Sequence, residues 1–148
     1  YLEFEFTESV VFDRTGEINQ VIRRIHALGA RCSMDDFGSS YSSPNMLRSL
    51  EVDIIKLDQG FFRGDTDMDK ARSIVNGIVR IARDMRIETV AEGIADMGQV
   101  DFLESVGCNV VQGYVFGKPM PADEFQDFKL DDTLRRNGDR GESVEESR

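Results

Sequence analysis

The sequence contains few of the residues that build disulfide scaffolds and zinc fingers. Its 148 residues include two cysteines, one histidine, three prolines and no tryptophan. Two cysteines cannot form a disulfide framework or a cysteine-rich metal site, and Cys32 and Cys108 both lie in apolar stretches. We therefore interpret them as buried thiols of a protein in a reducing compartment.

Long hydrophobic runs are also absent. No apolar stretch approaches the roughly 18 residues of a membrane span, and no signal peptide is recognisable. We expect no membrane contact within this chain and a cytoplasmic location, with any membrane anchor of the parent protein in other domains. No predicted strand is followed by a GxGxxG or GxxxxGK pattern, so a dinucleotide-binding or P-loop fold has little support.

Positive charge is scarce as well. Lys and Arg number 18 against 28 Asp and Glu, which gives a net charge of −10. A groove that binds polymeric nucleic acid through its phosphates needs the opposite sign, so we do not expect that class of partner. An acidic protein still binds a small phosphorylated ligand when metal ions supply the positive charge.

The two ends of the chain differ from its middle. The chain opens with Tyr1 in a strand-like YLEFEF segment, which we interpret as the start of a fragment of a longer protein. Residues 129–148 are dense in charge and nearly free of large apolar side chains, so they cannot bury a core. We expect a domain portion over residues 1–128 and a charged, disordered tail over residues 129–148.

Between these ends, strand and helix patterns alternate. Strands are predicted over residues 1–6, 30–37, 53–57, 87–92 and 109–114, and helices over residues 16–28, 45–50, 67–85, 97–106 and from 121 onward. Asp96 with Gln99 resembles a capping box, and Gly107 ends that helix. Strand and helix alternate about five times, which favours a parallel α/β fold.

Apolar residues at helical spacing predict which helix faces are buried. The first helix is predicted to bury Ile18, Val21, Ile22, Ile25 and Leu28. The third is predicted to bury Met68, Ala71, Ile74, Val75, Ile78, Val79, Ala82 and Met85.

A polar residue stands where each predicted strand ends: Glu5, Asp35, Asp36, Lys56, Glu92 and Gln112. In a (β/α)8 barrel these carboxyl ends converge on one face, which carries the active site. Oxygen ligands without His or Cys suit Mg²⁺ or Mn²⁺ better than zinc. Several carboxylates around Asp35 and Asp36 can hold two cations roughly 3.5–4 Å apart, which suits hydrolysis of a phosphate ester.

Each of these residues has a simpler interpretation when it is taken alone. An aspartate at a strand end is often a turn former or a helix cap. Lys56 has Asp53 and Asp58 nearby as ordinary ion-pair partners, and Gln112 is a polar residue near a turn. His26 is expected to face solvent or to pack locally rather than to take part in catalysis.

Five ordered motifs resemble those of one known family. EFTES, DDFGSSYSS, VDIIKLDQGF, ETVAEGI and VQGYVFGKPMP are similar to the successive motifs of the EAL domain, a cyclic-di-GMP phosphodiesterase of bacterial signalling. The match covers residues 1–128. The resemblance implies an α/β fold, a partial (β/α)8 TIM-like barrel whose N-terminal strands would precede Tyr1. It also implies hydrolysis of cyclic-di-GMP to linear pGpG with two Mg²⁺ or Mn²⁺ ions.

The resemblance assigns the chemistry to particular side chains. Glu5 would bind metal, and Asp35 and Asp36 would bind or bridge the pair of ions. Glu92 would ligate the second metal and act as a base on the attacking water. Lys56 would help to position that water or a substrate phosphate.

Two further residues receive supporting roles from the same resemblance. Gln112 would complete the polar lining of the substrate site, and Glu8 would support the loop after the aspartate pair without touching substrate. Cyclic-di-GMP would be the partner, and other signalling domains would be fused to this one in the parent protein. A homodimer stays an open alternative.

The sequence departs from the family pattern at three positions. Ser40 stands where the family usually has glycine, Pro44 where it has leucine, and Ala95 where it has a second glutamate. The glutamate of the family's naming motif and a later asparagine ligand would belong to strands before Tyr1, so we expect the fragment alone to be inactive. The alternative function is a catalytically degenerate EAL domain that serves as a cyclic-di-GMP receptor or a protein-interaction module.

Overall fold

The computed structural model describes residues 2–38, 44–63 and 68–128. Its strands are β1 (Glu3–Thr7), β2 (Arg31–Phe37), β3 (Ile54–Leu57), β4 (Glu88–Ala91) and β5 (Val110–Val111). Its α-helices are α1 (Glu8–Ala27), α2 (Pro44–Ser49), α3 (Met68–Asp84), α4 (Met97–Val106) and α5 (Ala122–Asp127), and a short 3-10 helix, η1, spans Gln59–Phe61. Each predicted strand and helix corresponds to one of these elements.

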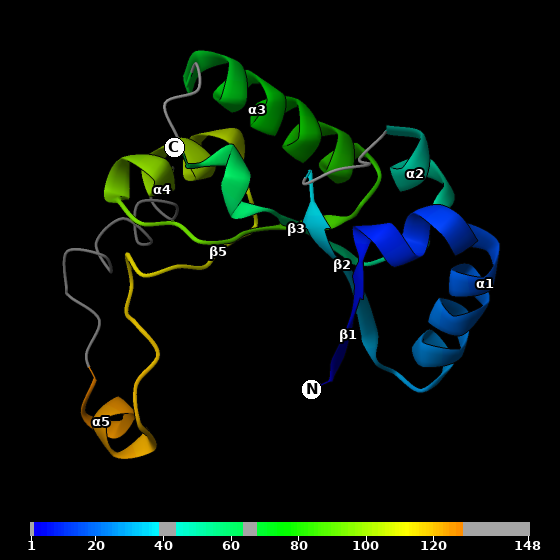
Figure 1. Ribbon diagram of the computed structural model, residues 1–148, viewed down its shortest axis with the longest axis horizontal. Coiled ribbons are helices and arrows are strands. Elements are labelled where there is room, and N and C mark those ends of the chain that lie inside the picture. Colours follow the sequence, from blue (N-terminus) through cyan, green and yellow to red (C-terminus); the bar gives the residue numbers. More distant parts are fainter. Residues whose placement is uncertain (1, 39–43, 64–67, 129–148) are drawn as a thin grey trace, which may run out of the picture. The chain divides into compact units, whose positions relative to one another are not determined.

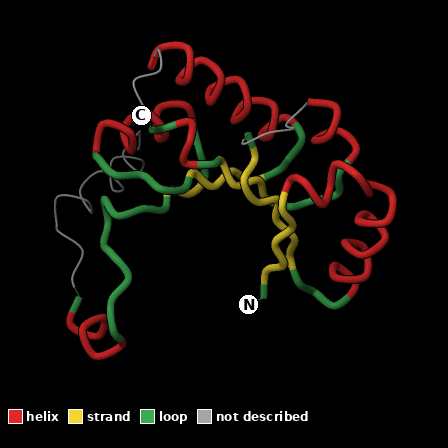
Figure 2. Tube along the Cα trace, in the orientation of Figure 1, coloured by secondary structure: helices red, strands yellow, loops and turns green. Residues whose placement is uncertain are grey.

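The five strands form one parallel sheet whose order, β1-β2-β3-β4-β5, follows the chain. Helices α1, α2, α3 and α4 supply the connections between successive strands. The sheet curves, and these helices lie along its outer side (Figure 1). Figure 2 shows the strands as an arc with helices α1–α4 outside it. This is the layering of a (β/α) barrel, so the predicted α/β fold of partial-barrel type is confirmed.

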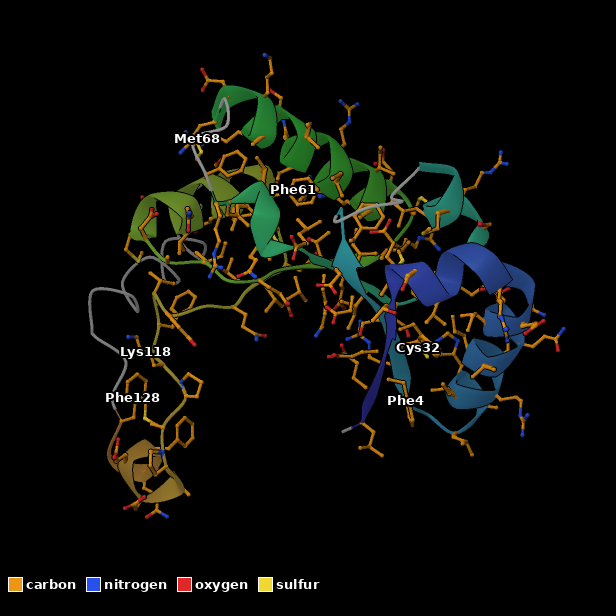
Figure 3. All side chains as sticks on the ribbon, in the orientation of Figure 1. Phe4, Cys32, Phe61, Met68, Lys118 and Phe128 are labelled. Carbon is orange, nitrogen blue, oxygen red and sulfur yellow. The ribbon has the colours of Figure 1, made fainter. Side chains whose placement is uncertain are left out.

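The hydrophobic core lies between the outer face of the sheet and the helices. Side chains alternate between the two faces of a strand, so one set points to the helices and the other to the concave face. Figure 3 shows Cys32 lying between β2 and α1. The helix-facing residues at the centre of the sheet are fully buried: Cys32, Met34, Ile55, Leu57 and Ala91. Lys56, between two of them, therefore points to the concave face.

Helix α1 is longer than predicted and buries a narrower stripe. It begins at Glu8 rather than Gly16, with a kink at Arg14, where φ is −140° and ψ is 35°. Ile18, Ile22 and Ile25 are buried, as predicted. The prediction was wrong for two residues, because Val21 is 42% exposed at the edge of the stripe, and Leu28, in the C-cap, is 85% exposed.

Helix α3 likewise buries a narrower face than predicted. Val75, Val79 and Ala82 face the sheet and are at most 1% exposed. The prediction of burial was wrong for three larger apolar residues: Met68 is 42% exposed, Ile74 is 53% exposed and Met85 is 36% exposed. Only one face of the helix contacts the sheet, and these positions flank that face.

Both predicted caps of α4 are present, but the Gln99 side chain accepts from a different backbone N–H than in a capping box. Asp96 Oδ1 accepts a hydrogen bond from the Gln99 backbone N–H at 3.0 Å, and Gly107 ends the helix with φ at +78°. In a full capping box, Gln99 would bond the Asp96 backbone N–H. Instead, Gln99 Oε1 accepts from the Ala95 backbone N–H at 2.9 Å, which ties the loop after β4 to the helix.

The chain divides into two compact units, Tyr1–Val115 and Phe116–Arg148. In the second unit, the rings of Phe125 and Phe128 stack with centroids 6.5 Å apart. The predicted tail, residues 129–148, lies outside the described residues, and the domain boundary after residue 128 stays a prediction. Among the described helices, none has the length and hydropathy needed to cross a membrane.

Candidate metal centre

Three of the predicted site residues meet on the concave face of the sheet, although Glu5 is the middle residue of β1 and not its last. Lys56 on β3 forms ion pairs with Glu5 of β1 and with Glu92, which directly follows β4; its Nζ lies 3.2 Å from Glu92 Oε1. The Lys56 side chain is 13% exposed, while the carboxylates of Glu5 and Glu92 are 49% and 27% exposed. Residues far apart in sequence thus share one charged cluster on the concave face.

The charge state of Lys56 follows from its surroundings. Burial lowers the pKa of its ammonium, but the hydrogen bond to Glu5 and the charge of Glu92 outweigh that effect and raise the pKa above its ordinary value. These two carboxylates therefore favour the protonated form of Lys56 in the metal-free protein. Neither Asp53 nor Asp58 is its partner, because Asp53 bonds His26 and Asp58 bonds the Gly60 backbone N–H.

The adjacent aspartates lie at an irregularity in β2. Its pairing with β3 shifts register between Met34 and Phe37, and Asp36 has φ at +56°, a conformation that non-glycine residues rarely adopt. The Asp36 backbone N–H donates to Asp35 Oδ1 at 3.0 Å. Backbone strain of this kind collects at functional sites, where the surrounding fold maintains it.

Among the described residues around Asp36, negative charges outnumber positive ones. Burial raises the pKa of Asp36, and the negative charges of Asp35, Asp58 and Glu8 raise it further, while Lys56 lowers it. A pKa raised by neighbouring carboxylates shows that they lie close enough to repel one another. Divalent cations would remove that repulsion. Within the described part of the chain, however, no three of the carboxylates of Glu5, Asp35, Asp36 and Glu92 lie close enough together to share one ion.

Glu8 holds the start of the loop after the aspartate pair. It is 2% exposed at the first position of α1, and its Oε2 accepts a hydrogen bond from the Gly38 backbone N–H at 3.3 Å. Gly38 has φ at +104°, and a Cβ there would lie 2.1 Å from the ring of Phe61. Gly38, where this loop begins, thus has close contacts on two sides. Ser40 lies outside the described residues, as does the side chain of Pro44.

Gln112 reaches the same edge through its backbone. Its N–H donates to the Ala91 carbonyl at 2.8 Å, and its carbonyl accepts from the Ile94 N–H at 3.2 Å. A Cβ at Gly113 would lie 2.1 Å from the Ile94 carbonyl oxygen, so this segment lies flush against the loop that carries Glu92. The Gln112 side chain is exposed. Ala95, further along that loop, is exposed as well.

Sequence reasoning missed Asp58 as a member of this edge. It directly follows β3, and its negative charge contributes to the raised pKa of Asp36. Asp58 Oδ1 also accepts from the Gly60 backbone N–H at 2.7 Å, which begins η1. Asp58 directly follows a strand, as Glu92 does, so the same criterion applies to both residues. In the sequence, however, nearby Lys56 offered a simple ion-pair partner for Asp58.

Comparison with known proteins identifies the family. The model of the EAL domain matches residues 1–119. The chain belongs to the EAL domain family. Cyclic di-GMP phosphodiesterase PdeR of Escherichia coli is 37% identical to this EAL chain over 125 residues, which are 84% of the chain and 19% of PdeR. The bifunctional diguanylate cyclase/cyclic di-GMP phosphodiesterase MucR of Pseudomonas aeruginosa is 35% identical over 124 residues, 84% of the chain and 18% of MucR.

Solved EAL structures share the fold. The complex of PaMucR phosphodiesterase with c-di-GMP superposes with a TM-score of 0.76 at 35% identity, covering 84% of this chain and 50% of that one. The manganese/c-di-GMP complex of Klebsiella pneumoniae BlrP1 gives a TM-score of 0.71 at 31% identity, covering 79% and 30%. This EAL chain thus spans under a quarter of the two relatives' length and at most half of these solved chains.

Proposed function

We propose that this chain is the C-terminal portion of an EAL domain that hydrolyses cyclic-di-GMP to linear pGpG in its parent protein. The observation that carries the proposal is the Lys56 ion-pair cluster with Glu5 and Glu92, at the same edge of the sheet as Asp35 and Asp36. The names of the relatives support the substrate, and the manganese complex of BlrP1 supports a divalent metal.

The side chains would divide the work between metal binding and positioning. Glu5, Asp35, Asp36 and Glu92 are the oxygen ligands for two Mg²⁺ or Mn²⁺ ions. When bound, such ions lower the pKa of a water molecule and neutralise charge on the phosphate. The unusual backbone conformation of Asp36 fixes the direction of its carboxylate before an ion binds, so less conformational entropy is lost on binding.

Lys56 and Glu92 are the catalytic residues of this proposal. Lys56 remains protonated, so it orients the attacking water or a phosphate oxygen by donating hydrogen bonds. Glu92, already in contact with that ammonium, accepts the proton of the water. Gln112 lines the substrate site, and Glu8 keeps the loop after the aspartate pair in place.

The parent protein is proposed to be a cytoplasmic signalling protein with further domains fused to this one, and a homodimer is compatible with it. The bifunctional name of MucR supports the fusion. One observation favours a second candidate function, a receptor that binds cyclic-di-GMP without hydrolysis. Ala95 occupies the position of the family's second glutamate and contributes no carboxylate to the loop after β4.

The deciding experiment uses the full-length parent protein with cyclic-di-GMP and Mn²⁺, and follows pGpG by chromatography. We expect pGpG to form, and Asp36→Asn to lower the rate by about 100-fold or more, since it removes a ligand charge from the reacting centre. Asp101→Asn, on the exposed side of α4, is the matched control and should leave the rate unchanged. Binding of cyclic-di-GMP without pGpG would establish the receptor function instead.

A further inference from the structure

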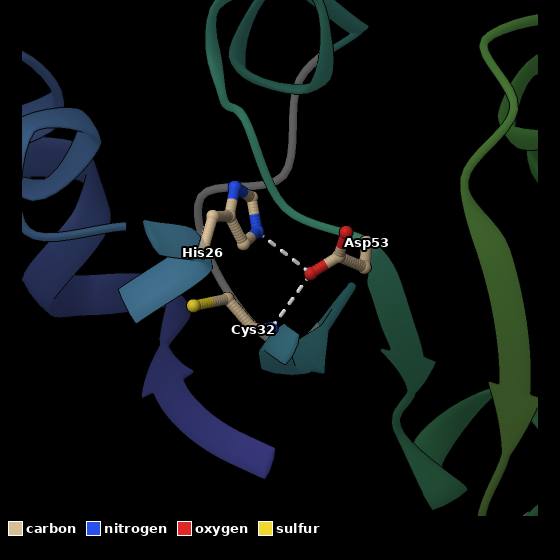
Figure 4. Close-up of side chains that lie close together, drawn as sticks. All are labelled: His26, Cys32 and Asp53. Carbon is tan, nitrogen blue, oxygen red and sulfur yellow. Dashed lines mark hydrogen bonds and ion pairs between the residues drawn. The ribbon is translucent and has the colours of Figure 1, made fainter. Parts of the chain in front are cut away.

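A second group of metal-ligating side chains lies at the opposite ends of the strands. Figure 4 shows His26, Cys32 and Asp53, which come from the last turn of α1, the start of β2 and the residue before β3. One ligand atom from each residue lies within 4.8 Å of the other two. Their spacing in sequence matches no zinc-binding motif, so the fold alone brings them together.

Two of the three ligand atoms are in hydrogen-bond contact, which a shared metal ion would replace while separating them by about 0.4 Å. His26 Nε2 lies 2.9 Å from Asp53 Oδ2. Ligand atoms about 2.0–2.1 Å from a tetrahedral zinc ion are separated by about 3.3 Å. Figure 4 shows the Cys32 thiol pointing away from Asp53, so binding one ion requires another staggered rotamer of Cys32 that turns Sγ toward the other two ligands.

A supporting hydrogen bond orients the carboxylate. The Cys32 backbone N–H donates to Asp53 Oδ2 at 2.7 Å, which fixes the direction of that oxygen. Metal ligands in proteins are commonly held in this way by a second hydrogen bond. The arrangement therefore provides both a donor set and part of the framework that keeps it in place.

Negative charge favours a cation here, whereas burial acts against the thiolate form of Cys32. Cys32 is fully buried, whereas the side chains of His26 and Asp53 are 35% and 32% exposed, so an ion has access from solvent and meets the thiol on the buried side. Burial raises the pKa of the Cys32 thiol, and the charges of Asp53 and Glu3 raise it further. The carboxylates that disfavour a thiolate in the metal-free protein attract a divalent ion, and a coordinated thiol loses its proton.

We propose that His26, Cys32 and Asp53 bind one Zn²⁺ ion, with water as the fourth ligand. Thiolate, imidazole and carboxylate are the donors that zinc uses, whereas the all-oxygen cluster at the other edge suits Mg²⁺ or Mn²⁺. The ion would join the end of α1 to β2 and β3, at the barrel face associated with stability rather than catalysis. This site is independent of the proposed phosphodiesterase activity.

The test uses the reduced 148-residue chain, stripped of metal with a chelator and titrated with Co²⁺, whose bond to a thiolate gives a charge-transfer absorption band. We expect one Co²⁺ per chain with this band, displacement by Zn²⁺ but not by Mn²⁺, and a higher Tm with Zn²⁺. Cys32→Ser should abolish the band. His26→Gln, which changes a partly exposed side chain, should weaken binding by roughly tenfold or more.

Cys108→Ser is the matched control, because Cys108 is also a free cysteine but its thiol faces the backbone carbonyls of Thr89 and Val110. It should retain the band and the Tm increase. If the wild-type chain shows no thiolate band, or if the band survives in Cys32→Ser or is lost in Cys108→Ser, the zinc site is wrong. Should Cys32→Ser fail to fold by circular dichroism, unchanged binding in His26→Gln refutes the proposal equally.

Discussion

The two edges of the sheet differ in how their charged side chains are arranged. At the amino edge, Arg31 forms an ion pair with Glu88 at 2.9 Å, and His26 Nε2 lies 2.9 Å from Asp53 Oδ2. At the carboxyl edge, Glu5 and Glu92 share Lys56, and burial together with neighbouring carboxylates raises the pKa of Asp36. The ion pair of Arg31 with Glu88 contributes to the framework, whereas the surplus of negative charge at the carboxyl edge suits the binding of cations there.

The largest expected effect comes from removing a charge at the carboxyl edge. Asp36→Asn should abolish metal-dependent activity of the parent yet raise the Tm of the metal-free protein, because it relieves repulsion from Asp35, Asp58 and Glu8. Formation of pGpG by the parent protein with Mn²⁺ measures the first effect, and thermal unfolding without metal measures the second. A lower metal-free Tm in the variant would contradict the idea that this edge is short of positive charge.

The pH dependence of that difference has a defined sign. The pKa of Asp36 is raised above 3.8, so the folded state binds the proton more tightly than the unfolded state. The stability that Asp36 contributes is present below the ordinary pKa and is lost as pH rises through the raised pKa. The Tm advantage of Asp36→Asn should therefore grow from acid to neutral pH. An advantage that shrinks over this range would contradict the stated cause.

A smaller effect is expected from Lys56→Met, which removes the cation between Glu5 and Glu92. Because Lys56 is largely buried but Glu5 is half exposed, the metal-free protein should lose about 1–2 kcal/mol of unfolding free energy. Mn²⁺ should restore more stability in this variant than in the wild type, since the ions replace the lost charge. If urea unfolding shows that Mn²⁺ stabilises Lys56→Met and the wild type equally, the ions do not bind beside Lys56.

The smallest effect is expected at the amino edge. Arg31→Gln breaks an ion pair whose side chains are both 47% exposed, so unfolding free energy should fall by about 0.2–1 kcal/mol. Cyclic-di-GMP hydrolysis by the parent protein should be unchanged. A large loss of activity in this variant would show that the two edges are not separate in function.

Local sequence patterns were sufficient to predict the elements and which strand ends carry polar residues. Glu5, Lys56 and Glu92 were predicted to share one edge because parallel strands present their carboxyl ends together, and the ion pairs of Lys56 agree with that. The exposure of Val21 and Leu28 was not predictable, because it depends on how a straight helix lies on a curved sheet. The roles of Asp35, Asp36 and Gln112 in binding stay predictions.

The sequence by itself determined the order of strands and helices, the net negative charge and the family, since periodicity and motifs are local properties of the chain. The tertiary structure decided the partners. Lys56 bonds a glutamate 51 positions away rather than either nearby aspartate, and His26 meets Asp53, 27 positions away, beside Cys32. The physical reason is that strand pairing and helix packing set distances between side chains, and separation along the chain does not encode them.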